Sequence, residues 1–241
     1  MRLQKTALIT GASRGIGAAI ATILAQNGYD CIMTCSNTLT ALEQLAQKLS
    51  EAYSVKCTAI LADAGNEEDI RQLFNGLEHL DVLVNNAGIS HMGLLSDMTS
   101  EEWHRVMNVN LGGLFYTCKR AIPLMLHNHA GHIINISSIW GNVGASMEVA
   151  YSASKGGVNA FTKALAKELA PSGISVNAIA CGVIDTQMNA ILSPEEKDAL
   201  KEEIPADRFG TCEEVASLVY QLVNAPGYLT GQIITLDGGF C

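Results

Sequence analysis

Short runs of apolar and β-branched residues alternate along the chain with longer segments that have the apolar periodicity of a helix. The short runs predict strands at residues 6–10, 31–35, 56–61, 82–85, 132–137, 174–180 and 232–236. The longer segments predict helices near residues 16–27, 39–50, 67–78, 100–127, 151–169 and 211–223. This alternation indicates repeated βαβ units, so we expect a doubly wound α/β fold, a seven-stranded parallel sheet flanked by helices.

Three predicted helices begin with N-terminal caps. The caps are Thr99 with Glu102, Thr211 with Glu214, and Ser193 followed by Pro194. The first two fit the capping box, and proline after Ser193 suits the first helical position. The third cap predicts an additional helix at 194–203, inserted after the sixth strand. Because substrate-covering segments belong beyond the carboxyl end of a strand, we expect a substrate-loop helix near 187–208.

The composition is that of a folded chain. Of 241 residues, 48% are hydrophobic and 16% are charged, which is enough for a buried core and too little charge for an intrinsically disordered protein. The chain contains no linker, repeat or low-complexity stretch. We therefore expect a single domain over residues 1–241.

The balance of charge excludes several kinds of partner. Fifteen Lys and Arg stand against 24 Asp and Glu, a net charge of -9, and no basic run offsets the repulsion from a nucleic acid or an anionic membrane. Seven cysteines are scattered without a pairing pattern, which favours a reducing compartment. No apolar stretch approaches the ~18 residues of a membrane span. We expect a cytoplasmic protein that binds neither nucleic acid nor membrane.

The first motif with chemical meaning, TGASRGIG at 10–17, joins the first predicted strand to the first helix. Glycines at such a turn let the backbone approach a pyrophosphate, which the amide groups and dipole of the helix N-terminus attract. The motif predicts a nucleotide site, and a bare tight turn is the alternative.

The residues after the second strand bear on which cofactor binds. A carboxylate about 20 residues after the glycines would bind the ribose 2′-hydroxyl of NAD, but residues 34–37 read Thr-Cys-Ser-Asn. Arg14 can form a charge-assisted hydrogen bond to a 2′-phosphate, and Ser36 can donate another. These residues favour NADP(H). The alternative is that Arg14 is an ordinary surface arginine.

Ser138, Tyr151 and Lys155 form a second candidate set. Tyr151 and Lys155 are four residues apart and share one face of a helix. A phenol is a poor base at neutral pH, but a nearby ammonium favours the phenolate and makes its proton exchangeable. Ser138 follows the fifth strand, where its hydroxyl can bind a carbonyl oxygen. This set suits reversible proton delivery to a carbonyl, although the Tyr-Lys spacing alone is more often a solvated helix face.

Seven ordered motifs make the chain resemble a short-chain dehydrogenase/reductase, most like the bacterial 3-oxoacyl-[acyl-carrier-protein] reductases. They are TGASRGIG at 10–17, Asp63, NNAG at 85–88, NVNL at 108–111, INISS at 134–138, YSASK at 151–155 and LDGG at 236–239. The resemblance runs from Lys5 to Phe240 and implies a Rossmann-type fold and a homotetramer.

The resemblance also implies roles for individual residues. The implied catalytic set is Asn110, Ser138, Tyr151 and Lys155, in which Asn110 holds a water that links Lys155 to solvent. The implied cofactor-binding set is Gly11, Ser13, Arg14, Gly15, Ile16, Gly17, Ser36, Asp63, Ala64, Asn86, Ala87, Gly88, Tyr151, Lys155, Gly182, Ile184 and Thr186. Within that set, Asp63 and the Ala64 backbone hold adenine, residues 86–88 flank the adenosine ribose, and Ile184 and Thr186 bond the carboxamide and a phosphate.

Two departures from the family pattern bear on the site. Cys181-Gly182 replaces the usual Pro-Gly, which removes a fixed φ and adds a thiol. Arginines that commonly pair with an acidic carrier are absent, because those places read His129 and Ser172. The histidines at 127, 129 and 132 have no carboxylate or thiol beside them, so they favour a polar surface over a metal site.

Together, these observations predict NADPH-dependent reduction of a 3-oxoacyl thioester, with acyl carrier protein as a possible partner. One alternative is reduction or oxidation at another ketone or secondary alcohol, such as a sugar, a steroid or a small molecule. The other is a nucleotide-binding protein without catalysis. The intact set of Asn110, Ser138, Tyr151 and Lys155 argues against the last, since a binding protein has no need of all four.

Overall fold

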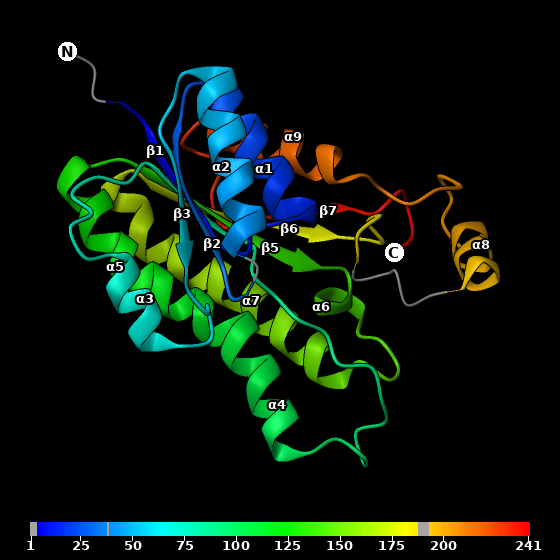
Figure 1. Ribbon diagram of the computed structural model, residues 1–241. Helices are drawn as coiled ribbons and strands as arrows, with labels where there is room; N and C mark the ends of the chain where they lie inside the picture. Colours follow the sequence, from blue (N-terminus) through cyan, green and yellow to red (C-terminus); the bar gives the residue numbers. More distant parts are fainter. Residues whose placement is uncertain (1–3, 38, 188–192) are drawn as a thin grey trace.

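The computed structural model describes residues 4–37, 39–187 and 193–241, and a seven-stranded parallel sheet lies at the centre of these residues (Figure 1). The strands are β1 (Thr6–Ile9), β2 (Asp30–Cys35), β3 (Cys57–Leu61), β4 (Val82–Asn85), β5 (Gly131–Ser138), β6 (Ile174–Cys181) and β7 (Ile233–Leu236). They lie in the order β3-β2-β1-β4-β5-β6-β7, and every neighbouring pair is parallel. The predicted doubly wound α/β fold is confirmed, and each strand begins and ends within one residue of its prediction.

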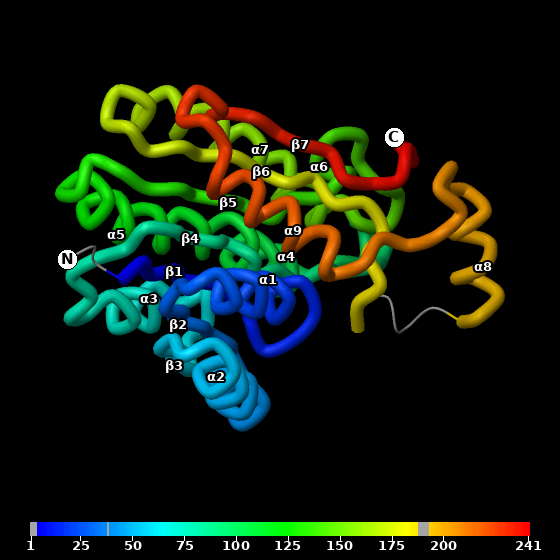
Figure 2. Tube along the Cα trace, turned by 90° about the horizontal axis from the view of Figure 1, so that it is seen from above, coloured from blue at the N-terminus to red at the C-terminus, as the bar shows by residue number. Residues whose placement is uncertain are grey.

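Helices cover both faces of this sheet (Figures 1 and 2). One face carries α1 (Gly15–Gln26), α2 (Leu39–Tyr53) and α9 (Cys212–Val223). The other carries α3 (Glu67–Leu73), α4 (Ser100–Met107), α5 (Gly113–Asn128) and α7 (Val149–Leu169). Side chains alternate between the two faces along each strand, so in β1 Ala7 and Ile9 pack in one apolar core and Leu8 in the other. Burial on both faces explains why the strands read as continuous apolar runs.

The segment predicted as one helix at 100–127 is interrupted by a π-helical turn, η1 (Asn108–Gly112), between α4 and α5. The prediction of one helix was wrong there because the buried side chain of Asn110 bonds to other segments, a tertiary effect that apolar periodicity does not report. Inserted π turns are frequent at functional sites.

The helices α3, α6 and α7 also differ from the predictions. α3 ends at Leu73 instead of near residue 78, since Gly76 takes a left-handed φ of +78° and turns the chain away. A short helix, α6 (Trp140–Val143), was not predicted, and α7 begins at Val149, two residues earlier than expected.

All three predicted N-terminal caps are present. Thr99, Thr211 and Ser193 each accept a hydrogen bond from the backbone of the glutamate three residues later, and each completes a capping box. Ser193 begins α8 (Pro194–Glu202), which lies at the end of the molecule beyond the carboxyl ends of the strands (Figure 1). Part of the predicted substrate loop, residues 188–192, lies outside the described residues.

Where α5 begins, its backbone approaches the loop after β3 very closely. A Cβ placed on Gly113 would lie 2.7 Å from the carbonyl oxygen of Ala64, closer than such atoms come in real proteins. Glycine at this position therefore brings η1 and α5 against the loop that contains Asp63. Within the described ranges, no helix is both long and apolar enough to cross a bilayer.

We predict that Gly113→Ala lowers the free energy of unfolding by about 1–3 kcal/mol, because the added methyl group meets fixed backbone. Gly156→Ala is the matched control on α7, since its Cβ would lie 3.5 Å from the Gly141 carbonyl, an ordinary contact. Alanine favours the helix interior by up to about 1 kcal/mol over glycine, so this control is expected to unfold at the same or a higher temperature. Equal melting temperatures for the two variants would contradict the prediction.

Candidate active site

Most of the predicted site residues lie at one edge of the sheet, where the carboxyl ends of the parallel strands meet (Figure 1). At this edge β1 leads into residues 10–17, called here the glycine loop, and β4 leads into residues 86–88. β5 ends at Ser138 and β6 ends at Cys181. The strand order reverses between β1 and β4, and doubly wound sheets bind ligands outside the carboxyl ends at such a point.

The glycine loop is held by hydrogen bonds from both strands that flank β1. On one side, the N–H of Ala12 donates to the carbonyl of Thr34 in β2 at 2.8 Å. On the other, Nδ2 of Asn86 donates to the carbonyls of Thr10 and Gly11 at 2.9 and 3.0 Å. The side chain of Asn86 therefore positions the loop, while the contact of residues 86–88 with a ribose stays a prediction.

Bare backbone in the glycine loop leaves room for a phosphate. Gly11 and Gly15 have left-handed φ values of +66° and +57°. A Cβ on Gly17 would lie 2.3 Å from the carbonyl oxygen of Gly11, so that position accepts only glycine. The first turn of α1 holds no acidic residue that would repel an anion. The loop fits the diphosphate of a dinucleotide, and the predicted contacts of Ser13 and Ile16 lie in this same turn.

Arg14 follows β1 and Ser36 follows β2, and these two strands are neighbours in the sheet. Ala12, two residues before Arg14, is hydrogen-bonded to Thr34, two residues before Ser36. Both residues are exposed, and the hydroxyl of Ser36 hydrogen-bonds to Oδ1 of Asn37. In the part of the chain that the structure describes, Arg14 forms no ion pair with a carboxylate. Its guanidinium is therefore available to a bound anion.

Asp63 takes part in an ion pair that the sequence did not indicate. Nη1 of Arg105 on α4 donates to Oδ2 of Asp63 at 2.7 Å. The other carboxylate oxygen accepts from the N–H of Gly65 at 2.9 Å. Both oxygens are thus held before any ligand is present, and Ala64 is buried beside them under α5. Contact of Asp63 and Ala64 with an adenine stays a prediction.

The structure brings the three predicted reactive side chains together where β5 ends and α7 begins. Lys155 is 4% exposed, and its Nζ donates to the carbonyl of Ile136 in β5 at 2.8 Å. The same Nζ lies 5.5 Å from the centroid of the Tyr151 ring, one helical turn earlier. Ser138 is buried, and its side chain hydrogen-bonds to that of Tyr151. A hydroxyl, a phenol and an ammonium therefore share one small volume.

Burial determines how these groups are protonated. It raises the pKa of the Tyr151 phenol well above its ordinary value; the negative charge that Cys181 or Glu148 can carry raises it further, and the hydrogen bond to Ser138 lowers it. Burial also lowers the pKa of Lys155 to about 8. At neutral pH the phenol holds its proton and the ammonium is mostly charged. Glu148, at the start of α7, is an influence on Tyr151 that the sequence analysis did not identify.

Both ends of the Asn110 side chain are hydrogen-bonded to protein groups. Its Nδ2 donates to the carbonyl of Ile89 and to Oγ of Ser154, both at 2.9 Å. Its Oδ1 accepts from the N–H of Ile89 at 2.9 Å. Ser154 donates in turn to the carbonyl of Tyr151 at 2.7 Å. The side chain of Asn110 therefore positions the loop after β4 and the first turns of α7.

A small cavity lies beneath this cluster. Its volume is about 10 Å³, and Lys155, Asn110, Thr10 and Asn85 are among the residues that line it. A cavity of this size is comparable to the space that one water molecule needs. The water that the resemblance places between Asn110 and Lys155 has room here, and its presence stays a prediction.

Cys181 occupies the position of the usual proline and is held from two sides. Its carbonyl accepts from the N–H of Ile139 at 2.9 Å, and the N–H of the following Gly182 donates to Leu236 in β7 at 2.9 Å. Burial raises the pKa of the Cys181 thiol to about 12, so it is neutral at physiological pH. Backbone hydrogen bonds to both neighbouring strands thus stabilise the turn in which the fixed φ of proline is missing.

The remaining cofactor candidates lie around the same edge. Thr186 packs next to Gly15, where a Cβ would lie 3.7 Å from Cγ2 of Thr186, and Ile184 is buried in a short bridge to Gly210. Gly88 faces the reactive cluster: a Cβ there would lie 3.4 Å from Oδ1 of Asn110 and 3.5 Å from Nζ of Lys155. The structure therefore brings the glycine loop, residues 86–88 and residues 182–186 to one place.

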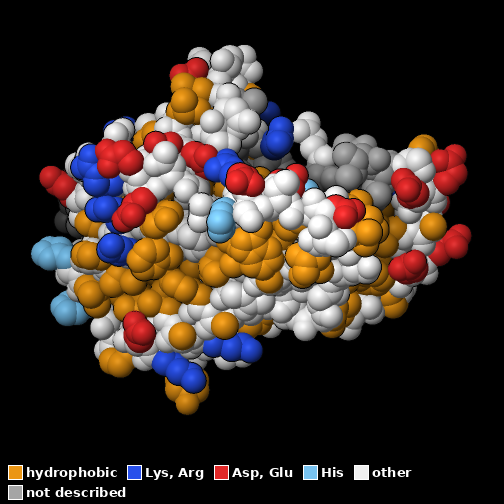
Figure 3. All heavy atoms as spheres, turned by 90° about the horizontal axis from the view of Figure 1, so that it is seen from below, with side chains coloured by type: hydrophobic (Ala, Val, Ile, Leu, Met, Phe, Trp, Pro, Cys, Tyr) orange, Lys and Arg blue, Asp and Glu red, His pale blue; other side chains and the backbone are white. Residues whose placement is uncertain are grey.

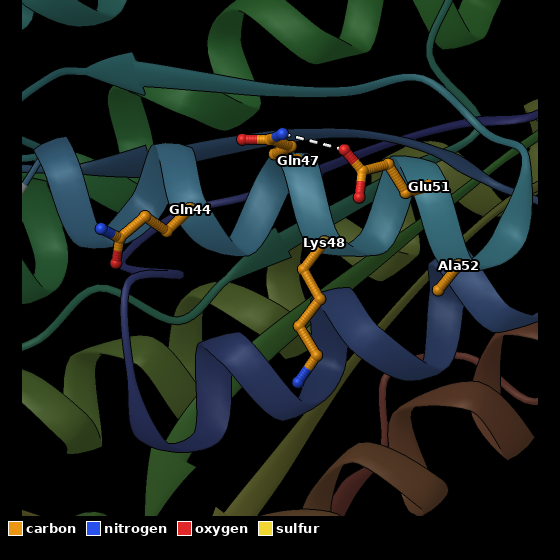
Figure 4. A pocket seen from close by; sticks show the side chains of 5 residues that line it. All are labelled: Gln44, Gln47, Lys48, Glu51 and Ala52. Atoms are coloured by element: carbon orange, nitrogen blue, oxygen red, sulfur yellow. Dashed lines mark hydrogen bonds between the residues drawn. The ribbon is translucent and has the colours of Figure 1, made fainter.

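An open surface depression along α2 lies apart from these residues (Figure 4). It is lined by Gln44, Gln47, Lys48, Glu51 and Ala52, and Gln47 donates to Glu51 at 2.8 Å. All of these residues belong to α2 itself, and none is among the candidate residues. Among the residues described, no three His, Cys, Asp or Glu side chains are gathered as ligands for a metal ion.

Comparison with known proteins agrees with this arrangement. The family model for short chain dehydrogenases matches residues 5–197, and the chain belongs to this family of oxidoreductases.

Several relatives extend over nearly the whole chain. A 3-oxoacyl-[acyl-carrier-protein] reductase FabG of Aquifex aeolicus is 41% identical over 245 residues, with 99% of this chain and 98% of that protein covered. The FabG of Staphylococcus aureus is 40% identical, with 99% of each chain covered. An uncharacterized oxidoreductase, YmfI of Bacillus subtilis, is 38% identical, also with 99% of each covered.

Among solved structures, a putative gluconate dehydrogenase from Agrobacterium tumefaciens has a TM-score of 0.92 and 33% identity. The match covers 98% of this chain and 95% of that one. Relatives named for such different substrates share this fold, so the substrate has to be argued from the site.

Proposed function

We propose that the protein is an NADPH-dependent reductase of 3-oxoacyl thioesters. The observation that carries this proposal is the cluster of Ser138, Tyr151 and Lys155 beside a glycine loop that fits a dinucleotide diphosphate. Relatives named as 3-oxoacyl-[acyl-carrier-protein] reductases support the substrate class.

In the proposed reaction, the glycine loop and residues 182–186 would hold a nicotinamide cofactor, which would supply hydride to the carbonyl carbon. Tyr151 donates the proton that the carbonyl oxygen takes up, and Ser138 holds that oxygen with its hydroxyl. Lys155 carries a positive charge below a pH of about 8, and this charge favours the phenolate that Tyr151 becomes. A phenol that is protonated at neutral pH suits the reductive direction.

Apolar side chains on the two segments that follow β4 and β5 support an acyl substrate. Met92, Leu94 and Leu95 are exposed on the loop after β4, and Val143 and Met147 are exposed between β5 and α7. These two segments touch, since the N–H of Gly93 donates to the carbonyl of Met147 at 2.8 Å. An apolar rim at this place favours a fatty acyl group over a polyhydroxylated acid.

A second candidate is a dehydrogenase of another ketone or secondary alcohol. The structural likeness to a protein named as a gluconate dehydrogenase supports this candidate. Its substrate would bring hydroxyl groups to the site, which the apolar rim does not favour.

We also propose that the protein forms a homotetramer in the cytoplasm. The face formed by α4, α5 and α7 shows a broad apolar area (Figure 3). Phe115 and Leu126 on α5 are among its exposed side chains. Large exposed apolar patches commonly mark protein contacts, and the molar mass in light scattering tests this assembly.

The proton-donor role predicts that Tyr151→Phe lowers kcat on an acetoacetyl thioester by about a hundredfold or more. NADPH affinity is expected to persist, because only the transferred proton is lost. Lys155→Met is expected to lower both turnover and cofactor affinity, as measured by NADPH absorbance and titration calorimetry. Near-normal kcat in Tyr151→Phe would refute the mechanism. Turnover of a gluconate-type substrate but of no 3-oxoacyl thioester would favour the second candidate.

Arg14 and Ser36 predict a preference for NADPH over NADH, measured as the ratio of kcat/KM values. The double variant Arg14→Ala with Ser36→Asp is expected to reverse the preference, because a carboxylate repels a 2′-phosphate and accepts from a 2′-hydroxyl. A wild-type enzyme that uses NADH at least as well would show that these two residues were wrongly assigned.

Carrier docking is expected to depend only weakly on salt. Arg105 pairs with Asp63, and Nζ of Lys119 lies 3.9 Å from Glu67, so each of these cations already has a carboxylate near it that weakens its attraction for an acidic carrier. The test measures kcat/KM for an acyl carrier thioester and for a small thioester at low and at high salt. We expect only a modest advantage for the carrier thioester and a shallow dependence of that advantage on salt. A carrier advantage of several hundredfold that disappears in salt would identify another basic surface as the docking site.

A further inference from the structure

The last five residues, Asp237 to Cys241, form a C-terminal tail with a defined conformation. One carboxylate oxygen of Asp237 accepts from the N–H of Gly239 at 2.9 Å, and the other accepts from the N–H of Cys241 at 2.9 Å. The tail starts beside the turn after β6, because a Cβ on Gly182 would lie 2.7 Å from Cα of Asp237. The tail is therefore anchored next to predicted cofactor-binding residues.

The tail also contacts the segment that returns from α8. The N–H of Ala206 donates to the carbonyl of Gly238 at 3.1 Å. Gly238 has a left-handed φ of +69°, and a Cβ on it would lie 2.9 Å from Cβ of Ala206 and 3.0 Å from Cγ2 of Ile204. Pro205 lies beside Gly239, where a Cβ would be 3.5 Å from the proline ring, an ordinary contact. Only glycine at position 238 allows this close approach, so the tail and residues 204–206 pack tightly against one another.

At its end the tail reaches the short helix that follows Ser138. The ring of Phe240 packs edge-on against the indole of Trp140, with 5.9 Å between centroids and an angle of 64°. Trp140 is the first residue of α6, and its backbone N–H donates to Oγ of Ser138 at 3.2 Å. Figure 2 shows the C-terminus near α6, on the side of the molecule that carries α8. The tail thus connects the segment after α8 to the residue beside the reactive hydroxyl.

We propose that the C-terminal tail is one wall of the substrate site, in which Phe240 holds Trp140 and thereby limits the size of the acyl group that fits beside Ser138. This inference rests on the proposed function, because it places the substrate carbonyl at Ser138 and Tyr151. Phe240 acts as a positioning residue, since its effect passes through Trp140. Edge-on aromatic pairs have a preferred geometry, so the pair gives the wall a fixed position.

The test compares kcat/KM for an acetoacetyl thioester and a medium-chain 3-oxoacyl thioester in wild type and Phe240→Ala. Loss of the ring enlarges the site, so the ratio of medium-chain to short-chain efficiency is expected to rise by about fivefold or more. KM for NADPH is expected to stay within about twofold of the wild-type value.

Two variants serve as controls. Phe240→Tyr keeps the ring and is expected to keep the wild-type ratio. Tyr228→Ala is the matched control, because Tyr228 is 100% exposed and precedes β7.

A second measurement does not depend on turnover. In a Trp103→Phe background, Trp140 is the remaining tryptophan of the two in the chain. Adding Phe240→Ala is expected to move its fluorescence emission to longer wavelength, because the indole loses an apolar neighbour. A melting temperature equal to that of the background variant excludes general unfolding as the cause.

Two results would overturn the proposal. One is an unchanged chain-length ratio in a folded Phe240→Ala variant. The other is an equal rise of KM for acyl substrate and for NADPH, which indicates a general loss of structure at the site. Failure of the proposed function looks different: the wild type then reduces no 3-oxoacyl thioester but does reduce another ketone. The same comparison between a small and a large ketone of that class then decides the role of the tail.

Discussion

A buried chain of side-chain hydrogen bonds fixes how the helices lie on the sheet, and the geometry of the site depends on it. Nδ2 of Asn85 in β4 donates to Oδ1 of Asn135 in β5 at 2.9 Å. Thr117 on α5 donates to Asn85 at 2.6 Å, and Asn135 donates to Thr162 on α7 at 2.9 Å. All four side chains are buried, so a shift of either helix would leave polar groups without partners. This constraint sets the position of α7 relative to β5.

The position of α7 in turn determines the chemistry of the reactive cluster. Lys155 reaches back from α7 to the carbonyl of Ile136, so its ammonium is buried and its pKa is lowered. Tyr151, one turn away, lies close enough to interact with this charge, and Ser138 meets it from the end of β5. A hydrogen-bonded scaffold that is itself buried keeps these groups in place without a ligand.

Segments beyond the strands lie outside the common core, and we propose that they complete the substrate site. The loop after β4 and the segment between β5 and α7 supply an apolar rim, while the C-terminal tail meets the return from α8 and the start of α6. These segments contribute little to the common core, so they are free to differ between relatives that are named for different substrates. We therefore propose that these segments govern substrate choice, whereas the reactive side chains lie at the end of β5 and on α7.

The sequence by itself determined the seven strands, the helix caps and the glycine loop, because each depends on residues near one another in the chain. Spacing alone also placed Tyr151 and Lys155 on one helical face. The tertiary structure decided the π turn at Asn110, the pairing of Asp63 with Arg105 and the bonds from Asn86 to the glycine loop. Those partners are separated by 21 to 76 positions in the sequence, and local periodicity carries no information about which distant groups burial will bring together.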